Sequence, residues 1–240
     1  MNFGARRGSY RVDRPYLLVV PVLLVVAQMV YGVATGQLWP LVGAALVSVC
    51  CAVGLYTNRR GKFQTWGWLL DDFEFAGDER VLDIGCGRGA VLMLAAHRLP
   101  HGQAVGVDLW RRRDHSGNAA AATRANAVRE GVADRVALCT ADMRALPFAD
   151  GSFDLVTSSL AVHKVPGRIE RDQVMAEAVR VLRPGGRLVI ADIRATRQYR
   201  EQLSASGMVA VTRRGLGWRM WWSGPWLPTH AVAAAKTYLP

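Results

Sequence analysis

The sequence lacks charge over one long internal stretch. No Asp, Glu, Lys or Arg occurs among the 44 residues from Pro15 to Asn58. A soluble domain seldom leaves so much chain uncharged, and a secretory signal peptide has a shorter apolar core followed by a cleavage site. Residues 35–37 divide the stretch into segments 16–34 and 38–56. As helices, these segments would each measure about 28 Å, close to the roughly 30 Å thickness of a bilayer's hydrocarbon core.

We therefore predict a transmembrane helical hairpin within residues 1–60, with spans at 16–34 and 38–56 and the lipid bilayer as partner. Buried core helices of a soluble protein are the alternative. Basic residues lie outside both spans and none lies in the turn, so the positive-inside rule places both termini and the following domain in the cytoplasm. Small residues at 32–36 and 43–45 allow close helix contact and leave open a homo-oligomer formed through these helices. The flanking basic residues are Arg6, Arg7, Arg11, Arg14, Arg59, Arg60 and Lys62.

Acidic residues and cysteines are scarce. The chain has 19 acidic residues and 30 Lys and Arg, which gives a net charge of +11. This balance suits an anionic partner such as a membrane surface or a nucleic acid. The four cysteines show neither zinc-ligand spacing nor a disulfide framework, so we predict no metal site and a reducing environment for the globular part.

Strand and helix patterns alternate from residue 61 to the end of the chain. An apolar helical pattern at Phe63, Trp66, Leu70 and Phe73 comes first, and we expect this helix to lie against the bilayer. The alternation predicts an α/β fold, a doubly wound, mostly parallel, seven-stranded Rossmann-like sheet. The expected strands are 81–84, 104–109, 136–139, 153–158, 187–192, 209–213 and 231–235, and the expected helices are 90–99, 118–130, 171–182 and 198–206.

Candidate ligand-binding residues follow the first three strands. "VLDIGCGRG", from Val81 to Gly89, reads as a strand, a glycine-rich turn and the start of a helix, where the backbone approaches a ligand closely. Nucleotide-binding proteins in general share this pattern. Asp108 ends the next strand, 19 residues after Gly89, where its carboxylate can accept from both hydroxyls of a ribose. Asp142 ends the third strand, where it can accept from an adenine amino group.

Five segments occur in order: "VLDIGCGRG", "GVDLW", "TADMRALPF", "FDLVTSSLAVHKV" and "VLRPGGRLVIADI". With them, residues 62–240 resemble the class I S-adenosylmethionine-dependent methyltransferases, within the methyltransferase-11-like small-molecule branch that includes quinone-type and other lipophilic-substrate enzymes. The resemblance implies S-adenosyl-L-methionine as cofactor. It also implies cofactor contacts from Asp83, Gly85, Cys86 and Gly87 at the methionine end, Asp108 and Leu109 at the ribose and adenine, Asp142 and Met143 at the adenine edge, and Ser158 beside the methionine.

Two motifs of other methyltransferases are missing, and their absence narrows the range of expected acceptors. No Asp/Asn-Pro-Pro-aromatic tetrapeptide follows the fourth strand, which argues against methylation of DNA or of amino groups on adenine. No Pro-Cys dipeptide occurs there, which argues against cytosine C5 chemistry. A nicotinamide-dependent dehydrogenase is a weaker interpretation, because it gives no role to Asp142 or to the "LRPGG" turn.

His163 is the candidate catalytic residue. It follows the fourth strand, where an acceptor should meet the methyl group, and histidine suits a general base. A structural histidine bonded to backbone is the alternative. Trp110 and Ser159 are candidate substrate contacts together with His163, and a cap is the alternative for Ser159. Asp192 at the end of the fifth strand either faces the pocket or serves the fold.

Two further segments are rich in charged or aromatic residues. Residues 111–113 form an arginine run, and Asp114, Ser116 and Asn118 suit helix capping better than substrate contact. Near the C-terminus, tryptophans alternate with arginines, a composition typical of a membrane interface; packing of the last strand pair is the alternative. The residues are Trp218, Trp221, Trp222 and Trp226, with Arg213, Arg214 and Arg219.

The sequence thus predicts a membrane anchor over 1–60 and a methyltransferase domain over 61–240. The expected reaction is transfer of a methyl group from S-adenosylmethionine to a small lipophilic acceptor, such as a quinone, phenolic lipid or fatty acid. The expected location is the cytoplasmic membrane face. The alternatives are an RNA methyltransferase that uses the basic surface, which the anchor does not favour, and a non-catalytic scaffold that keeps the cofactor fold.

Overall fold

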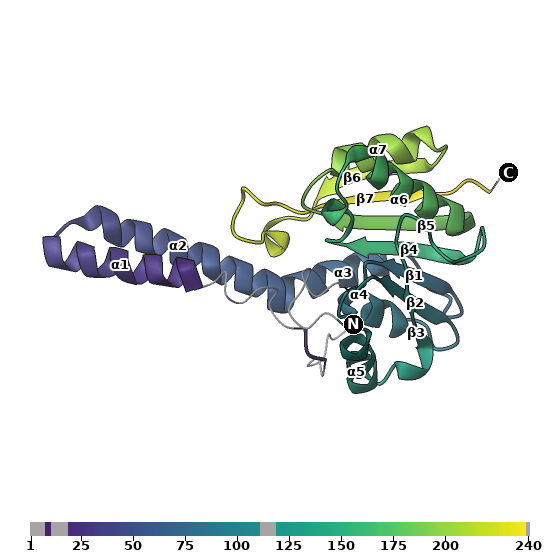
Figure 1. The fold of residues 1–240 in the computed structure, drawn as a ribbon, viewed down its shortest axis with the longest axis horizontal. Coiled ribbons are helices and arrows are strands. Elements are labelled where there is room, and N and C mark those ends of the chain that lie inside the picture. The colour runs from purple at the N-terminus through teal and green to yellow at the C-terminus, as the bar shows by residue number, and fades with distance from the viewer. Residues whose placement is uncertain (1–7, 11–18, 111–118, 239–240) are drawn as a thin grey trace.

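A helical hairpin projects from an α/β domain in the computed structural model, which describes residues 8–10, 19–110 and 119–238 (Figure 1). Helices α1 (Val19–Thr35) and α2 (Leu38–Tyr56) run antiparallel and turn at Gly36, whose φ of 70° suits glycine. Both were predicted from the sequence; residues 16–18 lie outside the described residues. Within the hairpin, a side chain at Gly32 would meet Leu41 and one at Gly43 would meet Gln28. These two glycines therefore serve packing between α1 and α2.

Helix α2 does not end at the domain. It continues through a π-helical turn (Thr57–Gly61) into α3 (Lys62–Asp71), so one 34-residue helix runs from Leu38 to Asp71. By length and composition, this is the one helix among the described residues that is long and apolar enough to cross a membrane; α1 has 17 residues. Only 6% of its apolar window is buried, whereas the core helix of a soluble protein is mostly buried.

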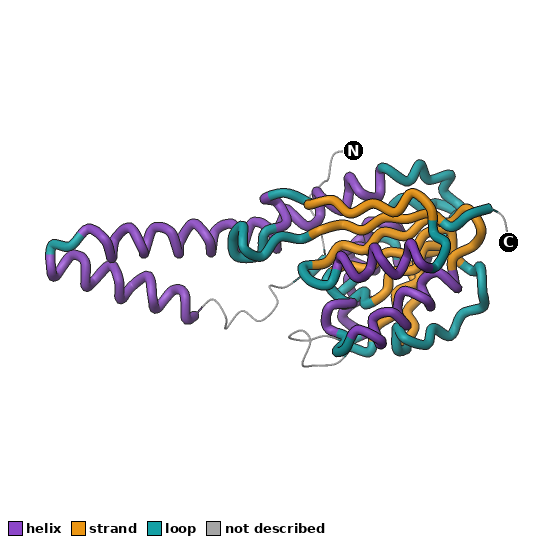
Figure 2. Tube along the Cα trace, turned by 90° about the horizontal axis from the view of Figure 1, so that it is seen from above, coloured by secondary structure: helices purple, strands orange, loops and turns teal. Residues whose placement is uncertain are grey.

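The sheet contains seven strands in the order β3-β2-β1-β4-β5-β7-β6, and β7 alone runs antiparallel to its neighbours (Figure 1). The predicted fold class of the α/β domain is confirmed. Helices α3, α4 and α5 cover one face, and α6 and α7 cover the other (Figure 2). The strands are β1 (Arg80–Ile84), β2 (Gln103–Asp108), β3 (Val136–Thr140), β4 (Phe153–Ser159), β5 (Leu182–Asp192), β6 (Val209–Gly215) and β7 (His230–Ala235). The helices are α4 (Ala90–Ala96), α5 (Ala120–Glu130), α6 (Arg168–Val181) and α7 (Thr196–Ala205).

Helix α3 belongs to the core of the α/β domain. Six of its ten residues are buried, among them Phe63, Trp66 and Leu70. These side chains pack with apolar residues of α4 and of the central strands. The expectation that this helix lies against the bilayer is therefore wrong, because its apolar stripe faces the sheet. Phe73, which the sequence pattern assigned to the same helix, follows its end.

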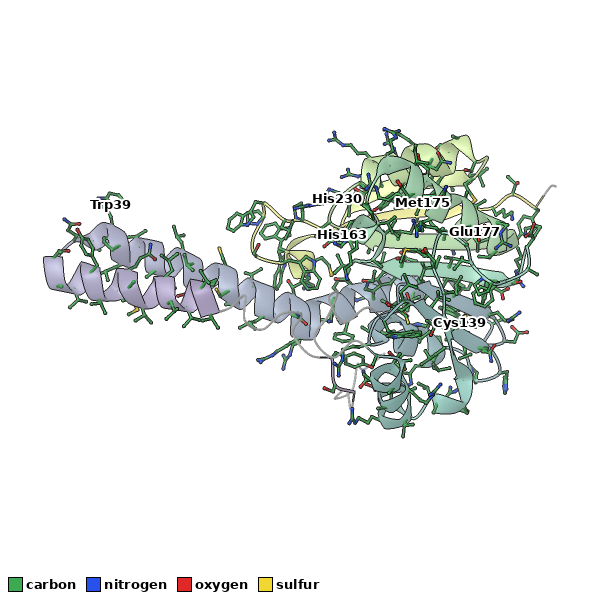
Figure 3. All side chains as sticks on the ribbon, in the orientation of Figure 1. Trp39, Cys139, His163, Met175, Glu177 and His230 are labelled. Atoms are coloured by element: carbon green, nitrogen blue, oxygen red, sulfur yellow. The ribbon has the colours of Figure 1, made fainter. Side chains whose placement is uncertain are left out.

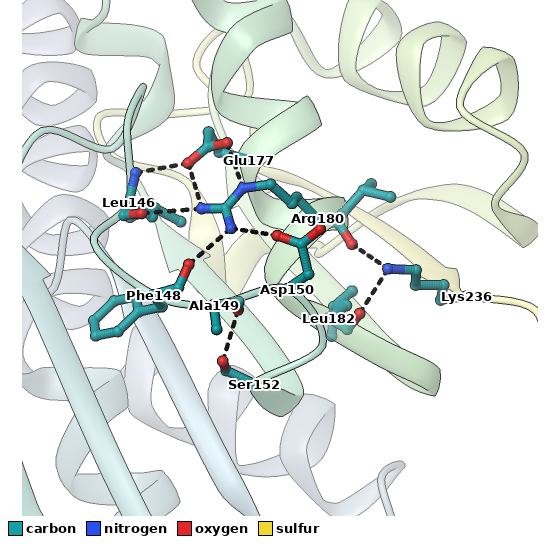
Figure 4. Close-up of polar contacts among 10 residues, drawn as sticks. Leu146, Phe148, Ala149, Asp150, Ser152, Glu177, Arg180, Leu182 and Lys236 are labelled. Atoms are coloured by element: carbon teal, nitrogen blue, oxygen red, sulfur yellow. Dashed lines mark hydrogen bonds and ion pairs between the residues drawn. The ribbon is translucent and has the colours of Figure 1, made fainter. Parts of the chain in front are cut away.

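Arg180 ties the long connection between β3 and β4 to α6 (Figure 4). Its guanidinium donates to the carbonyl oxygens of Leu146 (2.9 Å) and Phe148 (2.7 Å) and pairs with Asp150 and Glu177. These carboxylates raise the pKa of Arg180, and Arg180 lowers the pKa of Glu177. The connection that begins with Asp142 and Met143 is thus fixed at its far end.

Candidate functional site

The glycine-rich loop joins β1 to α4 at the carboxyl edge of the sheet. Gly85, Gly87 and Gly89 have φ values of 70°, 51° and 80°, a region that side chains disfavour. A side chain at Gly85 would also collide with Ala161, which follows β4. The loop therefore leaves a cradle that a Cβ would fill.

Asp108 holds the edge of this cradle. Its Oδ2 accepts from the backbone N–H of Gly87 (2.9 Å), and its Oδ1 accepts from that of Trp110 (2.6 Å). A carboxylate has about four acceptor positions, so these two bonds orient it and leave capacity for paired hydroxyls. The Trp110 indole donates to the Gly87 carbonyl at 3.3 Å and so packs beside the loop. Leu109, which lies between Asp108 and Trp110 in the sequence, is partly exposed.

Asp83 lies at the floor of the same loop and is almost completely buried. Its Oδ1 accepts from the Thr157 hydroxyl at 3.0 Å. Burial raises the pKa of Asp83 to about 7, against the opposing effect of that hydrogen bond. Burial also raises the pKa of the Cys86 thiol well above its ordinary range. A cationic group next to Asp83 would favour its ionised form.

A pocket of about 620 Å³, part of it open to solvent, lies over the loop. It brings together five of the candidate residues: Asp83, Gly85, Cys86, Gly87 and Ser159. Asp108, Leu109, Trp110, Asp142, Met143, Ser158 and His163 lie outside its lining. Sequence reasoning did not assign to the site seven of the residues that line it: Tyr10, Lys62, Arg88, Ala90, Val91, Leu160 and Trp222.

Three candidates take other contacts. The Ser158 hydroxyl donates to the Ile84 carbonyl at 2.8 Å and so joins β4 to β1. Asp142 pairs with Arg144 at 2.6 Å near the surface. The Met143 side chain lies near Gly85, within ordinary contact of a Cβ placed there. The arginine run and the capping candidates at 111–118 lie outside the described residues.

His163 faces a buried carboxylate. Its Nδ1 lies 2.5 Å from Asp192 Oδ1, and its backbone N–H donates to Asp192 Oδ2 at 3.0 Å. Tyr199 also donates to Oδ2, at 3.4 Å, and its pKa is raised by burial and by Asp192, so the phenol remains a donor. Asp192 has no exposed surface. The carboxylate therefore orients the imidazole and leaves the other ring nitrogen, Nε2, for a proton. Figure 3 places His163 on the side of the domain that faces the hairpin.

The segment between β4 and His163 is held by α3. The Trp66 indole, which is 1% exposed, donates to the Ser159 hydroxyl at 2.9 Å. The next residue, Leu160, has a φ of 54°, a strained conformation for a branched side chain. Its N–H donates to the Ala191 carbonyl at 2.9 Å, which holds the strained residue against β5. Both Ser159 and Leu160 line the pocket.

The connection between β6 and β7 clasps the base of the hairpin. The Thr57 hydroxyl donates to the Trp221 carbonyl at 2.6 Å, and the rings of Tyr56 and Trp218 stack with centroids 4.9 Å apart. Side chains at Gly54 or Gly61 would collide with backbone carbonyls of this connection. We name the connection, residues 216–229, the clasp. The Trp218 ring packs on the helix, although Trp218 and Trp226 also keep large exposed surfaces.

Residues 8–10 lie against the α/β domain, and Tyr10 lines the pocket. Arg88 donates to the Ser9 carbonyl at 3.0 Å, and the Ser9 N–H donates to Asn126 at 2.8 Å. The Tyr10 ring packs edge-on against Phe63, with centroids 5.1 Å apart. A segment that precedes the hairpin in sequence thus contributes to the pocket of the α/β domain.

These features fit S-adenosylmethionine. The glycine cradle admits a ligand against backbone, Asp108 offers oriented acceptor capacity at the end of β2, and Asp83 offers a buried carboxylate for a cationic group. Among the described residues, no cluster of three or more His, Cys, Asp or Glu side chains is arranged to hold a metal ion.

Comparisons with known proteins agree with this fit. Residues 82–190 match a family described as "Methyltransferase domain". A methyltransferase of Streptomyces halstedii is 39% identical over 126 residues, which are 52% of this chain and 41% of that protein. A ubiquinone/menaquinone biosynthesis C-methyltransferase of Dinoroseobacter shibae is 38% identical over 152 residues, or 58% of this chain and 57% of that protein. The matches thus span about half the length of these relatives.

One solved structure illustrates the shared fold. Geranyl diphosphate C-methyltransferase from Streptomyces coelicolor, crystallised with S-adenosyl-L-homocysteine, superposes with a TM-score of 0.58. It is 19% identical, and the match covers 72% of this chain and 75% of that one. Residues 82–190 thus match a methyltransferase-domain family, and the α/β domain shares the fold of this solved methyltransferase.

Proposed function

Because residues 82–190 match a methyltransferase-domain family, we propose that the chain transfers a methyl group from S-adenosylmethionine to a small lipophilic acceptor. We further propose that the α1–α2 hairpin spans a membrane and holds the domain at its cytoplasmic face. The observation that carries the proposal is that one pocket is lined both by the glycine-rich loop and by Lys62 and Trp222 at the base of the hairpin.

Cofactor binding is assigned to residues of the glycine-rich loop and of β2. The bound cofactor supplies an electrophilic methyl group on a sulfonium and leaves as the neutral thioether. Asp108 accepts from the ribose hydroxyls while its own orientation is held by the N–H groups of Gly87 and Trp110. Asp83 in its ionised form balances the cofactor's ammonium group. The glycines exclude side chains from the space that the methionine end occupies.

Proton removal from the acceptor is assigned to His163. An acceptor hydroxyl that forms a bond to the methyl carbon must lose its proton, and a base near neutral pKa takes it most effectively. The Nε2 of His163 accepts this proton, and the charge that develops on the ring is balanced by Asp192, 2.5 Å from Nδ1. Tyr199 and the His163 N–H keep that carboxylate in place.

The exposed surface of the hairpin supports the anchor. Apolar side chains on both helices are largely exposed, including Val20 (70%), Leu23 (63%) and Leu46 (63%). Water-soluble proteins rarely expose a continuous apolar surface of this size. Trp39 lies at the far end of the hairpin (Figure 3), and Arg59 and Arg60 lie at its base. Aromatic and basic residues at opposite ends of an apolar span are typical of membrane proteins.

An RNA methyltransferase remains the second candidate, favoured only by the net charge of +11. A scaffold without catalytic activity is the third, and binding of the cofactor would argue against it. Both give the apolar hairpin no part in recognising a substrate.

Labelled S-adenosylmethionine distinguishes these functions. Detergent-purified full-length protein is incubated with the labelled cofactor and, separately, with lipid extract, RNA and soluble metabolites of the host. We expect label in an organic-extractable product. Label in RNA alone, or in a polar product alone, contradicts the lipophilic acceptor. Failure to bind the cofactor contradicts methyl transfer itself.

A further inference from the structure

The hairpin is joined to the domain by helix and not by a flexible linker. Backbone hydrogen bonding continues from α2 through residues 57–61 into α3, and the inner part of this helix is buried in the domain. The clasp packs directly on the helix at Gly54 and Gly61, where no side chain intervenes. The structure thus fixes the position of the pocket along the helix axis.

That position can be measured from the last residue of the apolar span. Lys62, which lines the pocket, comes six residues after Tyr56. At ~1.5 Å per residue, the pocket wall begins about 9 Å along the helix from the end of the span. The headgroup layer on each side of a bilayer is roughly 5–8 Å thick, and tilt of the helix reduces the height further. The Lys62 side of the wall therefore lies at the outer edge of the lipid headgroup layer.

The clasp supplies the other part of this wall, and its Trp222 carbonyl lies against Gly54, within the last turn of the apolar span. Trp222 lines the pocket beside Lys62, while Trp218 and Trp226 of the clasp are exposed. The Arg219 guanidinium lies 5.1 Å from the Trp68 ring centroid and 4.8 Å from that of Trp218. Tryptophan and arginine side chains favour the headgroup region, where one end of the side chain is hydrated and the other is apolar.

We infer that the acceptor is a membrane lipid whose methylated atom belongs to its headgroup, on a phenolic or other polar ring or head carried by a long apolar tail. This inference rests on the proposed function. The tail stays in the hydrocarbon layer while the head enters between Lys62 and Trp222. An acceptor carbon in the middle of an acyl chain is excluded, because it would have to rise from the hydrocarbon layer to the level of the pocket.

Photocrosslinking tests the height of the pocket. Benzoylphenylalanine replaces Trp222, Trp226, Leu24 or Tyr238 in the full-length chain, and each variant is reconstituted in vesicles of phosphatidylcholine and phosphatidylglycerol. Leu24 reports on the hairpin, and Tyr238, which is exposed and lies beside Gly185 of β5, is the control outside the clasp. We expect lipid adducts at 222 and 226, mapped by mass spectrometry to the headgroup and glycerol region, and none at 238.

The controls distinguish a failure of this inference from a failure of the proposed membrane anchor. Adducts at 24 without adducts at 222 and 226 overturn the inference and leave the anchor intact. The absence of adducts at 24 as well overturns the membrane anchor of the proposed function. Trp226 provides a reporter whose exposed side chain is replaced without disturbing the packed part of the clasp.

Acceptor probes test the chemistry. Vesicles carry either a phenol on a long alkyl chain or a phosphatidylcholine with a monounsaturated acyl chain, and the wild-type protein is supplied with methyl-labelled cofactor. We expect label in the alkylphenol at least tenfold above that in the acyl chain. Preferential label in the acyl chain overturns the inference.

Discussion

The two halves of the helix from Leu38 to Asp71 contrast in their surroundings. In the outer half, Leu38–Tyr56, only Ala44 is buried, whereas six of the ten residues of Lys62–Asp71 are buried. The outer half is apolar on all sides, and the inner half places its apolar side chains on one stripe, between polar residues such as Gln64 and Asp71. The same continuous helix thus has an exposed apolar surface at one end and a buried apolar stripe in the protein core at the other.

The largest expected effect comes from a matched pair of leucines. Leu70→Ala leaves a cavity in the core and should lower the free energy of unfolding by about 2–5 kcal/mol. Leu46→Ala removes the same atoms from an exposed position and should change it by less than about 0.5 kcal/mol in detergent. Chemical denaturation of the detergent-solubilised protein measures both. Equal losses would show that the outer half is also packed within protein.

A charged residue at position 46 tests whether the outer half of the helix lies in a membrane. Leu46 lies near the centre of α2, where an arginine should disfavour insertion by about 2.5–3.5 kcal/mol. We expect Leu46→Arg to reduce the membrane-bound fraction after alkaline extraction, with the Leu46→Ala variant as control. Retention equal to that of the control would contradict a transmembrane position for Leu46.

In the α/β domain, Asp83 should make the stability of the protein depend on pH. The pKa of Asp83 is about 7 in the native state, against 3.8 for an unperturbed aspartate. The native protein therefore binds more protons than the unfolded chain between about pH 4 and pH 7, so its stability should fall as pH rises through this range. Asp83→Asn should remove that part of the fall. Denaturation midpoints measured from pH 4.5 to 7.5 without cofactor test this, and an unchanged slope in the variant would count against it.

Loss of the proposed base should affect turnover alone. We expect His163→Ala to lower turnover at least tenfold while cofactor affinity stays unchanged, because the glycine-rich loop remains intact. Isothermal titration with the cofactor and a turnover assay on the acceptor lipid separate these effects. Turnover equal to wild type would exclude the role, and a parallel loss of cofactor affinity would indicate a structural one.

The smallest effect should come from the hydrogen bond that joins the helix to the pocket. Trp66→Phe keeps an aromatic ring in the core and removes the N–H that donates to Ser159. A net hydrogen bond contributes about 0.5–1.5 kcal/mol, so turnover should fall by about two- to tenfold. Ser159→Ala is the partner variant. If the bond positions the pocket segment, the double variant should lose no more than the larger single loss; additive losses would contradict coupling.

Local patterns predicted most of the fold. Alternation of strand and helix signals located all seven strands, and the missing charge located the two hairpin helices. Periodicity could not decide which surface the apolar stripe of α3 faces, because bilayer and protein core present the same requirement to Trp66. That choice depended on the residues of α4 and of the central strands that meet it.

Site residues were predictable from the sequence only where they belong to one short segment or motif. The glycine-rich turn and Asp108 lie within 28 residues of each other and follow a spacing that the sequence displays. The approach of Asp192 to His163 depends on neighbouring strands, since 29 residues separate the two in sequence. Tyr10, Lys62 and Trp222 reach the pocket from segments far from the motif, and no local pattern marks them as pocket residues.

Under the proposed membrane anchor, the direct packing of the clasp on Gly54 and Gly61 would also govern how the domain searches for its substrate. A domain on a flexible tether tumbles in three dimensions and presents its pocket to the membrane only part of the time. A helix held at both of these glycines leaves one free rotation, about the membrane normal, and translation within the plane. Encounters with the acceptor then become two-dimensional collisions, whose frequency follows lateral diffusion and the surface density of the lipid.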